Sequence, residues 1–180
     1  MGTIRLLGDA EAARLASLRP TYAFAGIDDL GIGAPSGFHR VEAERSLGRS
    51  PDAFWTAAEL LTTWQVHLRA GLDVRASSAR VEEGSVVTMR AGLGPFGLSA
   101  PCRVTKIVDE PDRRGFAYVT LPGHPESGAE SFLVERLPGG EVVARVSAVS
   151  RPASTLARLG GPVARQAQRL MTARYLRAFG

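Results

Sequence analysis

Hydrophobic residues follow a helical period up to Gly71 and an alternating period beyond it. The helical stretch starts at Ser50, a good N-cap, and Pro51 suits the first helical position. Its apolar residues recur three and four positions apart, at Phe54, Ala57, Ala58, Leu61, Trp64 and Leu68. Gly71 is typical of a helix C-terminus. The pattern predicts one helix between Ser50 and Gly71 with a buried face.

Beyond Gly71, apolar and polar residues alternate along six segments, as they do in strands with one buried face. The segments are Asp73–Val81, Ser85–Ala91, Leu98–Asp109, Arg114–Leu121, Ala129–Leu137 and Glu141–Ser150. Short connections with turn-forming residues separate them. Strands joined so tightly are antiparallel neighbours, so the pattern predicts a meander.

The N-terminal part of the chain predicts three short elements. Residues 1–20 predict an amphipathic helix anchored by Leu15 and Leu18. Residues 21–37 are rich in Gly, Pro and Asp and predict a loop. Phe38–Leu47 alternates weakly and predicts a first strand at the edge of the sheet.

A second helix is predicted at the C-terminal end. The helical period returns after Pro152, and Gly160-Gly161-Pro162 predicts a break followed by a longer helix. The inner stripe of that helix is expected to be Val163, Ala167, Leu170 and Met171.

Length and composition favour one globular domain. The chain has 180 residues, of which 44% are hydrophobic, enough for one well-buried core. We expect an N-terminal extension over residues 1–37 and a single domain over residues 38–180. No apolar run reaches the roughly 20 residues that span a membrane, and the N-terminus lacks the apolar run of a signal peptide. Cys102, the one cysteine, is expected to be a small buried side chain. A single cysteine forms no internal disulfide, which favours a cytoplasmic protein.

The positive charge does not predict nucleic-acid binding. The net charge is +4, but the arginines are scattered through every segment and no recognition motif accompanies them. The sequence has no phosphate-binding glycine loop and no paired CxxC motif. Its histidines, His39, His67 and His124, lie in different predicted elements without metal-ligand spacing. We therefore expect no cofactor and no metal, and the sequence does not define an oligomeric state.

The loop Gly123–Gly128 and the strand after it hold the candidate catalytic residues. His124 titrates near neutral pH and is a candidate general acid or base; alternatively, its imidazole bonds a backbone carbonyl and fixes the turn. Glu130 is the carboxylate that would assist it. Glu126 either contacts a ligand or makes the turn soluble and pairs with an arginine.

The candidate ligand-binding residues lie on the neighbouring predicted elements. Tyr118 and Thr120 share one face of their strand, because side chains alternate along a strand. Arg103 either points inward to meet an anionic group or outward to solvent. Trp64 belongs to the apolar stripe of the first helix, where core packing is the simpler interpretation. His67 lies at the edge of that stripe, either at a pocket mouth or on the surface.

The order of the elements resembles a known architecture: a strand, a helix, six strands and a long C-terminal helix. It is similar to the α+β helix-grip fold of the START and polyketide-cyclase (SRPBCC) superfamily. In that fold a curved antiparallel sheet, here of about six to seven strands, wraps around the terminal helix and leaves a cavity between them.

The residues themselves resemble a narrower family, the domain-of-unknown-function 1990 family. The resemblance is carried by TLPGHPESGAESF at 120–132, CRV at 102–104, SRPAS at 150–154 and LLTTWQVHLRAGLDV at 60–74. This chain departs from the family pattern at Ala129, where an acidic residue is expected before Glu130, and at Val149, where an aromatic residue is expected. The first departure argues against a mechanism with two adjacent carboxylates.

Two functions follow from the resemblance to the helix-grip fold. The first is binding of a hydrophobic small molecule, lipid-like or polyketide-like, in the cavity. The second is a cyclase, dehydratase or isomerase acting on a carbonyl compound there, with His124 as general acid or base. A third alternative is a protein-interaction module that uses the arginine-bearing C-terminal helix. Binding ranks first because the sequence shows no convincing catalytic pair.

Overall fold

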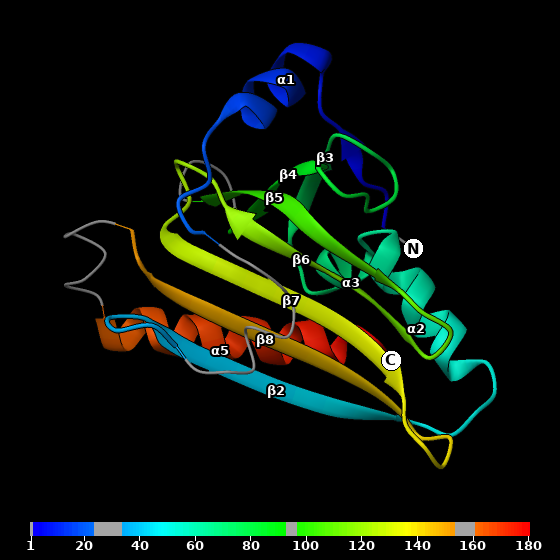
Figure 1. The fold of residues 1–180 in the computed structure, drawn as a ribbon. Coiled ribbons are helices and arrows are strands. Elements are labelled where there is room, and N and C mark those ends of the chain that lie inside the picture. Colours follow the sequence, from blue (N-terminus) through cyan, green and yellow to red (C-terminus); the bar gives the residue numbers. More distant parts are fainter. Residues whose placement is uncertain (1, 24–33, 93–96, 154–160) are drawn as a thin grey trace.

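One curved sheet of eight strands carries the fold (Figure 1). The computed structural model describes residues 2–23, 34–92, 97–153 and 161–180. The strand order is β1-β3-β4-β5-β6-β7-β8-β2. The strands are β1 (Arg5–Leu6), β2 (His39–Gly48), β3 (Asp73–Ala76), β4 (Val86–Ala91), β5 (Leu98–Asp109), β6 (Arg113–Thr120), β7 (Glu126–Arg136) and β8 (Val142–Pro152). Strands β3 to β8 form the predicted antiparallel meander.

The sheet has one strand more than the upper end of the predicted range. The additional strand is β1, which pairs in parallel with β3 through Arg5 and Leu6. Strand β2 pairs with β8 and forms the opposite edge, as its weak alternation predicted. Most of the predicted loop over residues 21–37 lies outside the described residues.

Helices cover both faces of the sheet. Helices α2 (Ala53–Thr62), α3 (Gln65–Arg69) and α5 (Gly161–Arg177) pack on its concave face, where α5 runs alongside β8 and β2 (Figure 1). Helix α1 (Asp9–Ser17) packs on the outer face, where Leu15 meets Val86 and Leu121. Leu18 packs beside it, as predicted.

The first predicted helix is two helices, separated at Trp64. Trp64 has a φ of 61°, a left-handed conformation that bulky residues rarely adopt, and it ends the helical hydrogen-bond ladder of α2. Its indole is fully buried and donates to the carbonyl of Ser78 at 3.3 Å. Gly71, with a φ of 89°, closes α3 as predicted. Ser50 does not cap α2 with its side chain; its carbonyl accepts from Ala53 in a preceding turn.

The buried face of α5 differs from the predicted stripe. Ala167 and Leu170 are exposed, whereas Thr172, Tyr175 and Leu176 are buried. Met171 packs against the core as predicted, and the side chain of Val163 lies outside the described part. Among the described side chains of α5, the buried ones lie in its C-terminal half.

Two glycines permit the close approach of curved strands. A Cβ on Gly115 would lie 2.1 Å from the carbonyl oxygen of Phe132 on β7. A Cβ on Gly128 would lie 2.1 Å from the carbonyl oxygen of Val149 on β8. Neither position admits a side chain without moving the neighbouring backbone.

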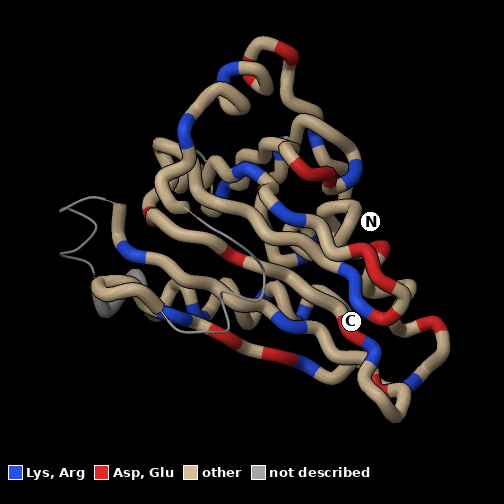
Figure 2. The backbone as a smooth tube through the Cα atoms, viewed as in Figure 1, with Lys and Arg blue, Asp and Glu red and all other residues tan. Residues whose placement is uncertain are grey.

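Residues of both charge signs lie close together on β2 and the neighbouring strands (Figure 2). Arg145 on β8 contacts Glu44 at 3.3 Å and Glu135 at 3.1 Å, and Arg113 reaches Glu135 from β6. These cross-strand pairs keep the outer face polar and leave the concave face to the core.

Candidate functional site

The concave face of β6, β7 and β8 changes character along the strands. Tyr118, Glu130 and Ala148 lie opposite one another in the register, and two residues further along Phe116, Phe132 and Val146 do the same. The second row belongs to the main hydrophobic core. The first row places a carboxyl group on the inner face of the sheet.

Glu130 and Tyr118 form the centre of the polar region. The Tyr118 hydroxyl donates a hydrogen bond to Oε2 of Glu130 at 2.5 Å. Burial raises the pKa of Glu130 to about 7; the neighbouring charge of Glu126 adds to this rise and the Tyr118 hydrogen bond opposes it. Glu130 nevertheless remains partly exposed, unlike Tyr118 beside it. The raised pKa favours the protonated form of this carboxyl group more than in an ordinary glutamate.

Helix α5 contributes a second tyrosine to this region. Burial raises the pKa of Tyr175 well above its usual value, and Glu130 raises it further, while a hydrogen bond with Tyr118 lowers it. Burial also raises the pKa of Tyr118 well above its usual value, and the charge of Glu130 raises it further. The free thiol of Cys102 is fully buried, as predicted, and burial raises its pKa. Both tyrosines and the cysteine are therefore neutral at physiological pH.

Glu126 belongs to a chain of hydrogen bonds that reaches α5. Its Oε2 accepts from the Ser150 hydroxyl at 2.5 Å, and Gln168 of α5 donates to the same hydroxyl at 2.9 Å. By strand alternation the side chains of Glu126 and Glu130 lie on the same face of β7. We call Tyr118, Glu126, Glu130, Ser150, Gln168 and Tyr175 the inner polar cluster.

His124 holds the turn before β7. The backbone N–H of Glu126 donates to Nδ1 of His124 at 2.9 Å, and the His124 N–H donates to the Leu121 carbonyl. Burial lowers the pKa of His124 to about 4, so the ring is neutral at physiological pH. Nδ1 also lies 2.9 Å from the carbonyl oxygen of Glu126, to which the ring donates in its other tautomer. Of the two alternatives from the sequence, this geometry matches a histidine that fixes the turn.

Thr120 and Arg103 bond to the backbone. The Thr120 hydroxyl accepts from Gly128 N–H at 2.9 Å and so extends the β6–β7 ladder past its last pair. Arg103 lies on the outer face, where its guanidinium donates to the carbonyls of Leu15, Ala16 and Leu18 at the end of α1. The inward position considered for Arg103 is wrong, because Cys102 and Val104 on either side of it face the core.

His67 lies in the core, neither at a pocket mouth nor on the surface. Its ring contacts those of Trp64, Phe116, Phe132, Tyr118 and Tyr175, with centroids 4.8–6.1 Å away. Both ring nitrogens are buried without a hydrogen-bond partner. Burial lowers the pKa of His67 to about 3. Trp64 packs in the core beside it, as predicted.

A model for the family described as domain of unknown function (DUF1990) matches residues 21–178. The chain belongs to this family. The UPF0548 protein of Deinococcus radiodurans is 35% identical over 155 residues, which are 80% of this chain and 76% of that protein.

Solved structures confirm the predicted helix-grip fold for this DUF1990 chain. Hypothetical protein jhp0584 from Helicobacter pylori matches with a TM-score of 0.62 and 10% identity, over 91% of this chain and 97% of its own. Ginseng major latex-like protein 151 from Panax ginseng matches with a TM-score of 0.51 and 17% identity, over 78% and 96%.

The two departures from the DUF1990 pattern lie together, away from the inner polar cluster. Ala129 and Val149 are cross-strand partners and are buried on the outer face beside Val119, Tyr22 and Phe38. An acidic residue at position 129 would point to the opposite face from Glu130. The departure at Ala129 therefore does not change the carboxylates of the concave face.

Sequence reasoning missed three members of the inner polar cluster. Ser150 stands in a segment that resembles the family and Gln168 in the predicted terminal helix, but only the packing of α5 on β8 joins them. Tyr175 lay outside the predicted stripe of the terminal helix. Among the described residues, no group of three or more His, Cys, Asp or Glu side chains is arranged to hold a metal, and no described helix has the length and hydropathy to cross a membrane.

Proposed function

We propose that the concave face between the sheet and α5 binds a hydrophobic small molecule, with Glu130 and Tyr118 as its polar contacts. The observation that carries the proposal is a half-buried glutamate within a small polar cluster, on a face that continues into the hydrophobic core. Sites for such ligands are mostly apolar with a few placed polar groups. The fold shared with other helix-grip proteins supports the same kind of site.

Side-chain size supports the same place. Glu130 has Gly128 two residues before it on its own strand, and Ala148 and Ser150 beside it on β8. Toward α2 and α3 the same face instead carries Phe116 and Phe132. Small side chains leave more volume between a sheet and a covering helix than aromatic ones do. The ligand is therefore expected beside Ala148 and Ser150, under α5.

The chemistry of Glu130 defines what the ligand presents to it. With a pKa of about 7, this carboxyl group is protonated in part of the molecules at neutral pH and ionised in the rest. The protonated form donates a hydrogen bond, and the ionised form only accepts. Tyr118 donates to the carboxyl group and orients it. A hydroxyl, carbonyl or amine on an apolar ligand would satisfy the remaining oxygen.

Filling the space tests the binding proposal. Ala148→Phe should abolish the thermal shift that wild-type protein shows with members of a fatty-acid and polyketide panel, and should remove any ligand mass seen by native mass spectrometry. Ala167→Phe is the matched control, since Ala167 is exposed on α5. Equal ligand responses in a folded Ala148→Phe variant and in the control would refute the proposed location.

A second candidate function is proton transfer to a bound carbonyl compound, and the pKa of Glu130 favours it. Glu130 is then the acid or base, with Tyr118 positioning it, and His124 maintains the loop. Glu130→Gln should lower turnover by about 100-fold or more, while His124→Ala should lower it much less. A larger loss in His124→Ala than in Glu130→Gln would restore His124 as the proton carrier.

A further inference from the structure

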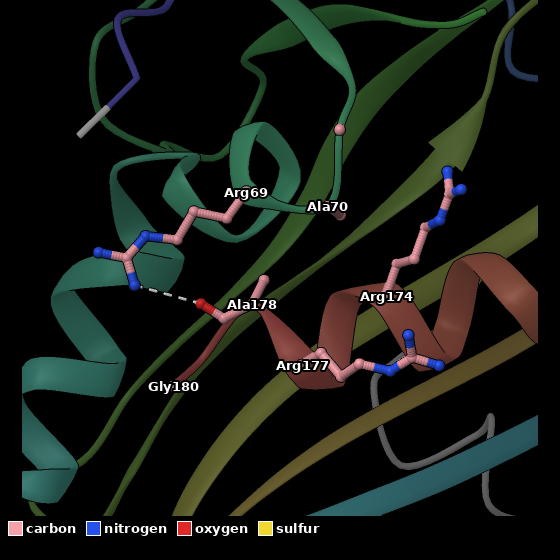
Figure 3. Close-up of a pocket in the computed structure, with 7 residues that line it drawn as sticks. Arg69, Ala70, Arg174, Arg177, Ala178 and Gly180 are labelled. Atoms are coloured by element: carbon pink, nitrogen blue, oxygen red, sulfur yellow. Dashed lines mark hydrogen bonds between the residues drawn. The ribbon is translucent and has the colours of Figure 1, made fainter.

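A cleft of about 540 Å³ lies where the C-terminal ends of α3 and α5 meet (Figure 3). Arg69 and the residues Ala70 and Gly71 line it from α3, and Arg174 and Arg177 line it from α5. Its volume is in the range of small-molecule sites, about 300–1,000 Å³. No member of the inner polar cluster lines it, so it is a separate site.

The charged side chains that line the cleft are all basic, and the backbone of Gly180 lines it beside them. The lining includes three arginines and no Asp or Glu side chain. None of the three forms an ion pair within the described part of the chain; Arg69 donates to the carbonyl of Ala178 at 3.3 Å. Other arginines here have carboxylate partners, as Arg75 has in Glu11 and Arg80 in Glu59. The charge of the cleft therefore remains available to an anion from solution.

Two arginine side chains reduce the negative charge that the end of α5 presents to the cleft. The last carbonyls of a helix carry partial negative charge, which repels anions. Arg45 donates to the Leu176 carbonyl at 3.1 Å and Arg69 donates to that of Ala178. These two bonds offset the carbonyl charge at the end of α5.

The arginines come to the cleft from two directions. In Figure 3, Arg69 reaches across to Ala178 at the end of the chain, while Arg174 and Arg177 extend from α5 on the other side. Arg174 and Arg177 are exposed, and their side chains make no hydrogen bond to another described residue, so a change of rotamer can bring both guanidinium groups to a shared ligand. Guanidinium groups match phosphate oxygens in paired hydrogen bonds.

We propose that this cleft binds the phosphate group of a small phosphorylated molecule. The phosphate lies between Arg174 and Arg177, Arg69 bounds the site from α3, and the rest of the cleft holds the remainder of the ligand. The bound anion bridges α3 and α5, so it also stabilises the attachment of α5 to the core. This site is independent of ligand binding at the concave face.

Titration calorimetry with pyrophosphate at low ionic strength tests the proposal. Replacing both Arg174 and Arg177 by alanine should weaken binding by about tenfold or more, because each charge-assisted hydrogen bond contributes substantially to affinity. Arg169→Ala is the matched control, an exposed arginine of the same helix outside the cleft. It should change the Kd by less than about twofold, the screening effect of one distant surface charge.

Three results would overturn the proposal. One is an absence of pyrophosphate binding by the wild-type protein. Another is an equal loss of affinity in Arg169→Ala and in the double variant, which would indicate unspecific attraction to a basic helix. The third is binding to vesicles that contain phosphatidic acid without binding to pyrophosphate, since the phosphate source would then be a membrane. Melting curves of each variant show that the fold is retained.

Discussion

The concave face of the sheet has an aromatic half near α2 and α3 and a polar half near the start of β7, and the two differ in packing. Near α2 and α3, the rings of Trp64, Phe116 and Phe132 pack without space and even enclose His67 with both nitrogens unpartnered. Near the start of β7, small residues surround a carboxyl group that remains partly exposed. One half maximises dispersion contacts and hydrophobic burial, while the other keeps polar groups that a folding core alone would not favour.

Truncating a ring in the aromatic half should have the largest effect on stability. Phe132→Ala removes a fully buried side chain stacked on Phe116 and should lower the free energy of unfolding by about 3–5 kcal/mol. Ser150→Ala in the polar half should cost about 1 kcal/mol, because it removes hydrogen bonds to Glu126 and Gln168 but no large volume. Urea denaturation measures both. Equal losses would remove the distinction between the halves.

Acid should destabilise the aromatic half through His67. The pKa of this ring falls to about 3 in the folded protein from about 6.5 in the unfolded chain, so only the unfolded state gains the proton between these values. Stability is therefore full above pH 6.5 and falls as the pH drops toward 3, by several kcal/mol from this group, at about 1.4 kcal/mol per pH unit.

Replacing the imidazole sharpens this test. His67→Phe should flatten the decline between pH 6.5 and 4 in a denaturation series, and it should also raise stability at pH 7 because two unpartnered nitrogens disappear. His39→Gln, at an exposed position, should leave the decline unchanged. An unaltered pH profile in His67→Phe would show that the imidazole is not the source of the acid sensitivity.

The polar half should respond to pH in the opposite direction, with a smaller effect. The pKa of Glu130 is raised to about 7 in the folded state from 4.5, so the folded state retains a proton that the unfolded chain releases. This contribution is complete below pH 4.5 and is lost as the pH rises through 7. Since Glu130 is partly exposed, the loss should be about 1–3 kcal/mol.

Glu130→Gln isolates that contribution. The difference in unfolding free energy between Glu130→Gln and wild type should grow in favour of the variant from pH 5 to pH 8. Glu83→Gln, at an exposed position in a loop, should show no such change. A constant difference across this range would mean that Glu130 titrates normally.

The hydrophobic pattern predicted most of the strands, but it did not predict β1 or the break between α2 and α3. Strand β5 occupies the predicted residues, although its pairing with β6 shifts register between Val104 and Lys106. Strand β1 has two residues, too few for any period to show. The break at Trp64 carried no local signal either, since tryptophan does not favour a positive φ. Packing of its indole against His67 and Phe116 holds that conformation.

The candidate site was predicted in part. The alternation argument placed Tyr118 on one strand face, and Glu130 was named on the adjacent strand; the register makes them partners. For His124 the sequence left two roles open, because a short loop does not reveal where a ring nitrogen finds its bond. For Arg103 the sequence did not decide which face of the strand the side chain occupies. The packing of α1 on the outer face explains its position there.

The sequence by itself determined the meander of β3 to β8, the long terminal helix and the family, because periodicity and local motifs are properties of neighbouring residues. Only the tertiary structure decided which side chains meet on the concave face and which part of α5 is buried. Tyr175, Gln168 and Ser150 are far from Tyr118 in the chain. The sequence of α5 has no strongly apolar stripe, so only packing against the sheet selects the face that is buried. Burial, which also moves the pKa of Glu130 toward neutrality, exists only once the sheet has curved around that helix.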